Sequence, residues 1–311
     1  MFSFQHQSVL LDQAVTALVN REDGTYIDGT FGRGGHSQLI LNRLQQAGRL
    51  IAIDKDPAAI EVGKSWQDKR FTIDKASFAA MTEISSGYGV KKVSGILLDL
   101  GVSSPQLDDA TRGFSFQADG PLDMRMDPTQ GQSLADWLAT ASQTDITEVI
   151  KYYGEERSAK QIAAALIARR NQEQELGKLN RTSELASIIA RIVKHHPHHR
   201  HPATKTFQAF RIFINQELDD LSIGLKAALA LLEKGGRLVV LSFHSLEDRI
   251  VKQFINSHSI LPTANRHLPF MMEQPPRLQL RRIARVRVDD NEKSTNARSR
   301  SVIMRVAEKL I

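Results

Sequence analysis

The sequence predicts an α/β fold in which a mostly parallel sheet is interrupted by a helical insertion. Short apolar runs alternate with helical patterns up to about Asp99, helical patterns dominate from about Pro105 to His201, and the alternation then resumes. Strands separated by helices require crossover connections, which make neighbouring strands parallel. We therefore expect a discontinuous α/β domain at 1–105 and 206–311, and an inserted helical domain at 106–205.

The first part of the chain contains most of the strand candidates. In chain order we expect a short amphipathic helix at 9–18, a strand at 25–28, a helix at 37–44, a strand at 49–54, a helix from Pro57 and a strand at 95–99. The last of these strands is apolar up to Asp99, which is typical of a strand covered by helices on both faces.

The middle and the end of the chain complete the pattern. Helical spacing predicts helices at 158–170 and 183–193, and one long helix from Phe207 to Leu232 that Gly235-Gly236 would end. A strand at 237–243, a helix at 245–255 and a strand at 301–306 follow. Insertions in such sheets occur in the carboxyl-end loops, where ligands bind, so the helical part is a candidate lid.

Composition excludes several classes of function. The 311 residues include no cysteine, so disulfide scaffolds, iron–sulfur clusters, thiolate zinc sites and cysteine nucleophiles are impossible. No apolar run approaches the roughly 18 residues of a membrane-spanning helix, and absent disulfides fit a reducing cytosol, so we expect a cytoplasmic protein without membrane contact. The net charge of +6 permits a polyanionic partner.

A glycine-rich turn from Asp28 to His36 joins a strand to a helix. Glycines let the backbone approach a ligand closely, and the free N–H groups of the helix favour a polar or anionic group. Asp54, at the end of the next strand, is placed to accept hydrogen bonds from ribose hydroxyls. A tight turn without a ligand is the alternative, but Asp54 and Asp99 at successive strand ends favour a nucleoside-containing cofactor.

The turn itself narrows the choice of cofactor. A dinucleotide fingerprint would need glycine or alanine in place of Ser37, and no phosphate-binding Gly-Lys-Ser/Thr follows. An acidic residue before the turn, here Asp28, is more typical of sites for S-adenosyl-L-methionine, whose sulfonium is a cation that carboxylates suit.

Several longer motifs resemble a known family, in order and nearly end to end. They are Asp99 to Asp108, Arg112 to Phe116, Pro121 to Asp127, His201 to Ile212, Ser242 to Arg249 and Asn296 to Ser301. These motifs resemble the MraW family of ribosomal RNA small-subunit methyltransferases. The resemblance implies a class I S-adenosylmethionine-dependent methyltransferase, with a Rossmann-like sheet and a helical insertion. It also implies methyl transfer to N4 of cytidine 1402 of 16S ribosomal RNA, with this RNA in the small subunit as the partner.

The resemblance also assigns residues to the cofactor. Carried over position by position, the contacts to S-adenosyl-L-methionine are Gly34, Gly35, His36, Asp54, Phe78, Asp99 and Gln106. Phe78 would lie against the adenine, although an ordinary core aromatic is the alternative interpretation.

Methylation of the cytosine amine requires that the amine be aligned with the methyl group, and it does not require a nucleophile on the enzyme. The exocyclic amine of cytosine shares its lone pair with the ring, so in-line attack on the methyl group needs close positioning and hydrogen-bond acceptors. Methylation at carbon 5 normally requires a cysteine, which this chain lacks. Asp99 is a candidate catalytic acceptor for the amine, or else binds only the cofactor, and Ser103 and Ser104 would shape the substrate loop.

Other polar clusters are candidates for RNA contact. Ser245 and Asp248 fit a helix-capping pair that leaves His244 and Arg249 unexplained, so these two are candidate contacts to a flipped nucleotide or its phosphates. The histidines from His195 to His201 favour a solvated basic loop over a metal site, because neighbouring prolines argue against a chelating helix. We therefore expect no metal. We also expect a set of arginines to form a strip that faces RNA phosphates: Arg277, Arg281, Arg282, Arg285 and Arg287.

Two other functions stay open at this point. One is methylation of another RNA or DNA amine, or of a ribose oxygen. The other is a noncatalytic, RNA-binding assembly factor that retains a cofactor pocket. Asp54 and the intact loop after Asp99 argue against the noncatalytic function.

Overall fold

The computed structural model describes residues 8–194, 201–260, 277–288 and 297–311. The chain divides into two compact units: unit 1 combines Met1–Gly101 with Leu218–Ile311, and unit 2 is Val102–Glu217. The insertion expected at 106–205 is therefore longer at both ends. The reason is packing, because Val102 at its start packs against the hydrophobic core of unit 2 and Phe210 near its end belongs to that core.

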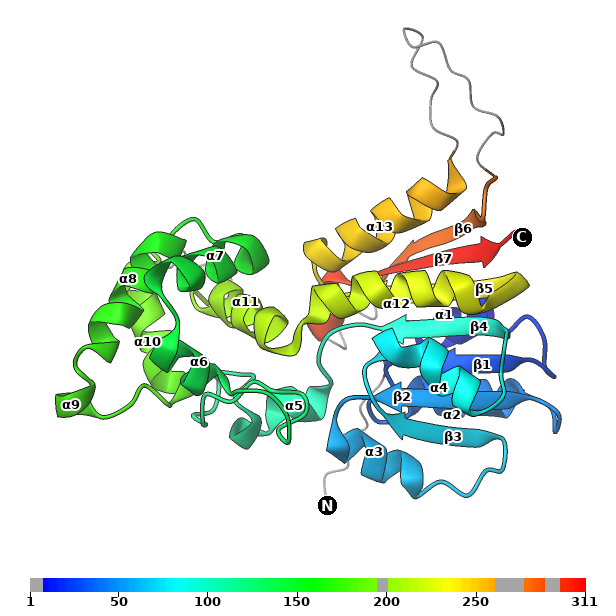
Figure 1. Cartoon of the computed structure of the whole chain (residues 1–311), viewed down its shortest axis with the longest axis horizontal. Helices are drawn as coiled ribbons and strands as arrows, with labels where there is room; N and C mark the ends of the chain where they lie inside the picture. Colours follow the sequence, from blue (N-terminus) through cyan, green and yellow to red (C-terminus); the bar gives the residue numbers. More distant parts are fainter. Residues whose placement is uncertain (1–7, 195–200, 261–276, 289–296) are drawn as a thin grey trace, which may run out of the picture. The chain divides into compact units, whose positions relative to one another are not determined.

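Unit 1 is built on a single sheet. In the described part of the chain its seven strands are β1 (Thr25–Asp28), β2 (Arg49–Asp54), β3 (Phe71–Lys75), β4 (Val93–Asp99), β5 (Leu232–Ser242), β6 (Leu280–Arg287) and β7 (Ile303–Lys309). Their order across the sheet is β3-β2-β1-β4-β5-β7-β6 (Figure 1). The strands from β3 to β5 are parallel, whereas β7 runs antiparallel to both β5 and β6. The predicted mostly parallel α/β sheet is confirmed.

Helices cover both faces of this sheet. The core on one face includes residues of α1 (Leu11–Leu18), α2 (Gly35–Arg43) and α3 (Pro57–Lys64). The core on the other face includes residues of α4 (Met81–Gly87), α12 (Glu217–Leu231) and α13 (Ser245–Ser259). Strand β2 shows why both faces are needed: Leu50 packs into the first core and Ile51 into the second, so successive side chains of the strand are buried on opposite sides.

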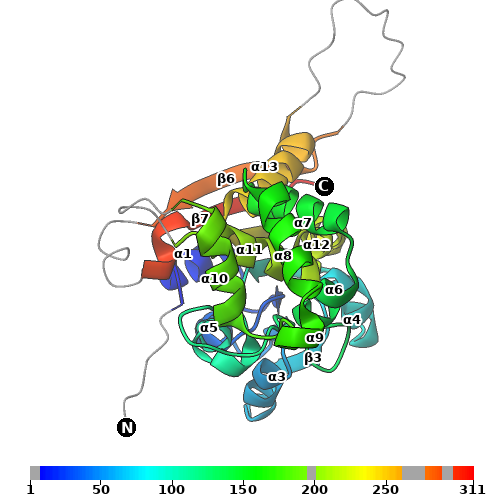
Figure 2. The ribbon, with the colours of Figure 1, turned by 90° about the vertical axis from the view of Figure 1, so that its left-hand side faces the viewer.

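Unit 2 is helical and has its own core. Its helices are α5 (Ser104–Asp108), α6 (Leu134–Thr140), α7 (Gln143–Gly154), α8 (Ala159–Arg170), α9 (Glu173–Leu176), α10 (Thr182–Ile192) and α11 (Thr204–Asn215) (Figures 1 and 2). Aromatic contacts join α6 to α11, where the Trp137 ring lies 4.6 Å from that of Phe213. None of the described helices is long and apolar enough to cross a membrane.

The predicted long helix over 207–232 is wrong. Helix α11 ends at Asn215, Gln216 adopts a left-handed backbone with φ 54°, and α12 begins at Glu217. The apolar stripe divides at the same point, because Phe210 packs into the core of unit 2 and Leu221 into that of unit 1. The continuous spacing therefore concealed two helices that belong to different cores.

The glycine pair at 235–236 does not end the helix either. Helix α12 ends at Leu231 and β5 begins directly at Leu232. Gly235 has φ 83° and lies where the pairing of β5 with β4 shifts register, between the Val93–Leu232 and Gly95–Arg237 pairs. The glycines thus accommodate an irregular start of the strand.

Candidate cofactor and active site

Polar side chains end the parallel strands at one edge of the unit 1 sheet. Asp28 ends β1, Asp54 ends β2, Asp99 ends β4 and Ser242 ends β5. Because parallel strands all finish at the same edge, these side chains share the rim where ligands of open α/β sheets bind. The sequence predicted that Asp28, Asp54 and Asp99 lie at strand ends along this rim.

Asp28 holds the glycine-rich turn in shape. Its Oδ1 accepts from the Thr30 N–H at 3.1 Å and its Oδ2 from the Ser37 hydroxyl at 2.6 Å. Burial raises the pKa of Asp28 to about 6, and these hydrogen bonds oppose the rise. Ser37, which departs from a dinucleotide fingerprint, therefore has a definite role, because it fixes the carboxylate that shapes the turn.

Asp54 links the turn to the second strand. Its Oδ2 accepts from the Gly32 N–H at 2.7 Å and its Oδ1 from the Asp56 N–H at 2.8 Å. Burial raises the pKa of this carboxyl group, and backbone donors counteract the rise. A carboxylate has about four lone-pair sites, so Asp54 keeps acceptor capacity for hydroxyl donors of a ligand.

The glycines after the turn are required by close packing. Gly34 has φ 80°, and a Cβ there would lie 2.4 Å from the Trp66 ring. A Cβ on Gly35 would lie 2.2 Å from Ser8 Oγ. Both positions open helix α2, whose first N–H groups are free of intrahelical partners. No larger residue fits at either position without displacing its neighbours.

Asp99 differs from the other rim carboxyl groups in having a buried oxygen without a partner among the described residues. His36 Nδ1 lies 3.5 Å from its Oδ2, while its buried Oδ1 has no hydrogen-bond partner among the described residues. Burial raises the pKa of Asp99 to about 8, and the nearby carboxylates of Asp28 and Glu247 add to the rise. A cation beside Asp99 would reverse this shift. The site therefore fits a positively charged ligand such as the sulfonium of S-adenosylmethionine.

The ring of Phe78 packs against helix α12 at Gly224. Phe78 begins the short 3₁₀ helix η1 (Phe78–Ala80), and a Cβ on Gly224 of α12 would lie 2.5 Å from its ring. Next to it the Ser77 hydroxyl donates to Asp220 Oδ2 at 2.7 Å, and Lys55 forms an ion pair with Asp220. Asp220 and Gly224 are one helical turn apart, so a single face of α12 positions both residues of the loop.

A model of the MraW methylase family matches residues 3–310 of the chain. The chain belongs to the MraW methylase family. It is 58% identical over 307 residues to Ribosomal RNA small subunit methyltransferase H of Burkholderia mallei (strain SAVP1), an alignment that covers 99% of this chain and 98% of the relative. The identity and both coverages are the same for the protein of that name from Burkholderia pseudomallei (strain K96243). As an MraW methylase, the protein is an S-adenosylmethionine-dependent methyltransferase.

Two solved structures are similar to the chain at much lower identity. A putative rRNA methylase from Clostridium thermocellum is 14% identical with a TM-score of 0.43, over 98% of this chain and 99% of that one. A putative methyltransferase from Streptococcus mutans in complex with SAH is 12% identical, also with a TM-score of 0.43, over 98% and 99% of the two chains.

The MraW methylase caps helix α13 in a way that differs from the sequence prediction. The capping pair is His244 with Glu247, not Ser245 with Asp248. Glu247 Oε2 accepts from the Phe243 N–H at 2.7 Å and the His244 N–H at 3.2 Å, and His244 Nε2 lies 3.1 Å from Glu247 Oε1. Capping therefore accounts for His244. Asp248 instead forms an ion pair with Arg305 on β7.

The remaining residues predicted for the cofactor and substrate sites lie in different parts of the chain. Gln106, Ser103 and Ser104 belong to unit 2, where the buried Gln106 side chain accepts from the Ser103 N–H at 2.9 Å and so fixes the start of α5. Arg249 is exposed on α13. Of the histidine cluster, 195–199 lie outside the described residues, while the ring of His201 lies 4.5 Å from that of Phe116.

Sequence reasoning missed several residues that shape the rim. Thr30, whose hydroxyl accepts from the Asp99 N–H at 2.6 Å, links two strand ends. Asp220 and Gly224 lie in a helix whose sequence gives no sign of contact with the loop around Phe78. Glu247 could have been found from the capping-box pattern, had the box been placed one residue earlier.

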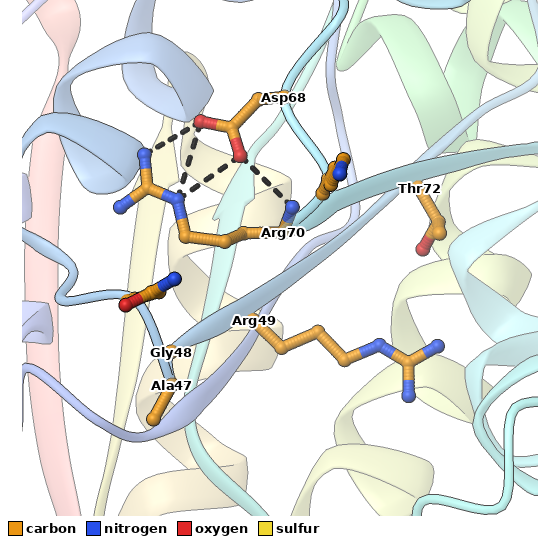
Figure 3. A pocket seen from close by; sticks show the side chains of 8 residues that line it. Ala47, Gly48, Arg49, Asp68, Arg70 and Thr72 are labelled. Atoms are coloured by element: carbon orange, nitrogen blue, oxygen red, sulfur yellow. Dashed lines mark hydrogen bonds and ion pairs between the residues drawn. The ribbon is translucent and has the colours of Figure 1, made fainter.

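A cavity of about 700 Å³ lies at the opposite edge of the sheet, where β2 and β3 begin. It is lined by Gln46, Ala47, Gly48, Arg49, Asp68, Lys69, Arg70 and Thr72 (Figure 3). The Asp68 carboxylate pairs with the Arg70 guanidinium there, which lowers the pKa of Asp68. This cavity contains none of the rim residues and is distinct from the candidate cofactor site.

Proposed function

We propose that the protein transfers the methyl group of S-adenosyl-L-methionine to N4 of cytidine 1402 in 16S ribosomal RNA of the small subunit. The names of the 58% identical relatives support the ribosomal RNA as the substrate. The observation that carries the chemistry is the buried Oδ1 of Asp99, which lacks a partner among the described residues and lies next to two further carboxylates.

The cofactor supplies an electrophilic methyl group on a sulfonium. Asp99 stabilises the cationic end in its ionised form, and Asp54 accepts from the ribose hydroxyls. Phe78, held against α12, stacks on the adenine. The opening of α2 at Gly34, Gly35 and His36 contacts the amino-acid end of the cofactor, and Gln106 completes the contacts assigned by the family resemblance.

Transfer is direct and in line, without a covalent bond between protein and substrate. The chain has no cysteine to form the adduct that methylation at carbon 5 normally requires. Alignment of the target amine with the methyl carbon then provides the rate enhancement. Because the cytosine is paired or stacked in a folded RNA, the reaction also requires that the base be extruded.

Unit 2 is the part that we assign to RNA recognition. Its chain leaves unit 1 directly after β4, three residues beyond Asp99, and its helices form an independent core. Ser103 and Ser104 open this unit and shape the loop on the substrate side, and Arg249 contacts RNA phosphate. The reaction takes place in the cytoplasm, where small subunits are assembled.

Labelled S-adenosylmethionine and small ribosomal subunits that lack the modification test the proposal. Nucleoside mass spectrometry should detect the label as N4-methylcytidine at position 1402, whereas subunits that already carry it should accept none. Label at carbon 5, on ribose or at another nucleotide would contradict the assignment, and so would absence of transfer.

A further inference from the structure

Strand β6 has a basic face that the cofactor site does not use. It lies at one edge of the sheet, and among the described strands it pairs only with β7. Arg282 lies opposite Ala307, Arg285 opposite Arg305 and Arg287 opposite Ile303. Ala307 belongs to the core on the face that α13 covers, and alternate residues of β7 share a face. The three arginines of β6 therefore share that face as well.

An irregularity in β6 brings these arginines together. The pairing with β7 shifts register between Arg282 and Ala284, so Ile283 is an extra residue in the strand. In a regular strand Arg282 and Arg285 would point to opposite faces, because side chains alternate. The bulge places them on the same face, and bulges often re-aim side chains next to functional sites.

The charges on this face are not balanced by the described residues. Arg282, Arg285 and Arg287 are exposed and have no ion-pair partner in the described part of the chain. Lys252 of α13, one turn after Asp248, is also exposed and likewise has no such partner there. We call Lys252, Arg282, Arg285 and Arg287 the basic face. Arg281, on the other face, forms an ion pair with Glu308.

The arrangement works against local stability. Arg285 lies directly opposite Arg305, and like charges at such positions repel each other. Asp248 compensates Arg305 through two hydrogen bonds of 2.7 and 3.0 Å and leaves Arg285 uncompensated. Charges that only protect an edge strand from pairing need not gather on one face. Uncompensated arginines on one face instead suit a polyanion, since the guanidinium fork matches phosphate oxygens.

The direction of β6 relates the basic face to the rim. Both β5 and β6 run antiparallel to β7, so β6 runs in the same direction as the parallel strands. Arg287 therefore lies towards the edge where Asp99 ends its strand, and Arg282 lies farther from it. Helix α13, which both views show beside β6, also begins at that edge (Figures 1 and 2). The basic face thus extends from the rim along the flank of the sheet.

We propose that the basic face binds the phosphodiester backbone of the substrate RNA on the side of unit 1 away from β3. This inference rests on the proposed function for the identity of the RNA. The contact is to phosphates and carries no sequence information, so it holds the RNA while other parts of the protein select the nucleotide.

A triple variant, Arg282→Gln, Arg285→Gln and Arg287→Gln, tests this surface with small ribosomal subunits that lack the modification. Its dissociation constant should rise by about tenfold at moderate salt, and the slope of log affinity against log salt should become shallower by about two to three. The affinity for S-adenosylhomocysteine should stay unchanged, as should the rate at saturating subunits. Thermal unfolding should show an intact fold, because Arg285 faces another arginine.

Arg281→Gln is the control, since it removes one positive charge from the opposite face of the same strand, and it is compared with each of the three substitutions made singly. Wild-type binding and salt slope in the triple variant would overturn the inference, and so would an equal loss in Arg281→Gln. The proposed function fails by a different result, which is absence of N4-methylcytidine with the wild-type protein. The binding measurement does not depend on that product.

Discussion

Asp99 combines features that seldom occur in a carboxyl group without a function. It ends a buried strand, one of its oxygens has no partner among the described residues, and its pKa is raised to about 8. Burial is the main cause, and the carboxylates of Asp28 and Glu247 add to it. In the free protein Asp99 therefore holds a proton at neutral pH, and a cationic ligand favours its loss.

We expect Asp99→Asn to weaken binding of S-adenosylmethionine by roughly tenfold to a hundredfold, the range for losing a hydrogen bond or contact to a charged group. Calorimetry at pH 8.5 would measure it, with the exposed Asp12→Asn as the control. Weaker binding with an unchanged single-turnover rate would limit Asp99 to the cofactor, whereas a slower rate would make it catalytic. Unchanged affinity would contradict both roles.

The raised pKa also predicts a pH dependence of binding. Below about pH 8 the ligand-free protein must release the proton of Asp99 before the carboxylate can face a sulfonium. Affinity for S-adenosylmethionine should therefore increase as the pH rises towards 8 and level off above it. S-adenosylhomocysteine, which is uncharged at sulfur, should show a smaller change. A flat profile for both ligands would count against an ionised Asp99 in the complex.

Substitution of Gly224 tests whether the contact between α12 and the Phe78 ring supports cofactor binding. A Cβ at Gly224 would lie 2.5 Å from the ring, so Gly224→Ala should displace Phe78 and weaken cofactor binding by roughly tenfold, or about 1.4 kcal/mol. Gly87→Ala in α4 is the control, because nothing lies within 4 Å of its added carbon. In a Phe78→Ala background the Gly224 substitution should have little further effect. Equal losses in both backgrounds would mean that Gly224 acts independently of the ring.

At the scale of secondary-structure elements, the sequence predicted the helices and strands whose apolar residues follow a clear pattern. Strands β1 and β2 match their expected bounds, because apolar runs between glycine turns identify buried parallel strands. Strand β6 was missed, since it lies at an edge and half of its eight residues are arginine, so it lacks the apolar pattern of a buried strand. The break at Gln216 was missed because one apolar spacing continued across two cores.

The candidate site was predictable to the same degree. Residues at strand ends follow from topology, so Asp28, Asp54 and Asp99 could be placed together from the sequence. Contacts made by a helix far along the chain could not, because nothing local to Asp220 or Gly224 indicates which loop α12 will cover. The hydrogen bond between Ser77 and Asp220 joins residues 143 positions apart.

The cap of α13 gives a prediction at this scale. Glu247 is 2% exposed and accepts from two backbone N–H groups, so Glu247→Ala should lower the free energy of unfolding by about 1 to 3 kcal/mol. Urea denaturation would measure it. The exposed Gln253→Ala on the same helix should change the free energy by less than about 0.5 kcal/mol. Similar stability of the two variants would show that the cap is unimportant.

At the scale of the whole molecule, the buried carboxyl groups link stability to pH. The pKa values of Asp28 and Asp99 are raised to about 6 and about 8 from an ordinary value of 3.8. Between the ordinary pKa of 3.8 and the raised pKa of each group, the folded state holds a proton that the unfolded state has released. The stabilisation from this difference is fully present below about pH 4 and is lost as the pH rises through about 6 and then about 8.

We therefore expect these two groups to make the ligand-free protein less resistant to urea at pH 8 than at pH 6. The change should be smaller in Asp99→Asn, which has no proton to release. Equilibrium unfolding at several pH values would measure it, and the same pH slope in the variant and the wild type would contradict the assignment to Asp99. Saturating S-adenosylmethionine should reduce the slope as well, because it favours the ionised group.

The strand order has a consequence for synthesis of the protein. Strand β7 follows β6 in the chain yet lies between β5 and β6. A growing chain that emerges amino end first therefore displays β6 before its native partner, β7, has been made. At ordinary translation rates this interval lasts roughly one to five seconds. During this time the positive charges of β6 would hinder its pairing with other nascent chains. The strand to which we assign RNA binding would thus also protect the unfinished chain from aggregation.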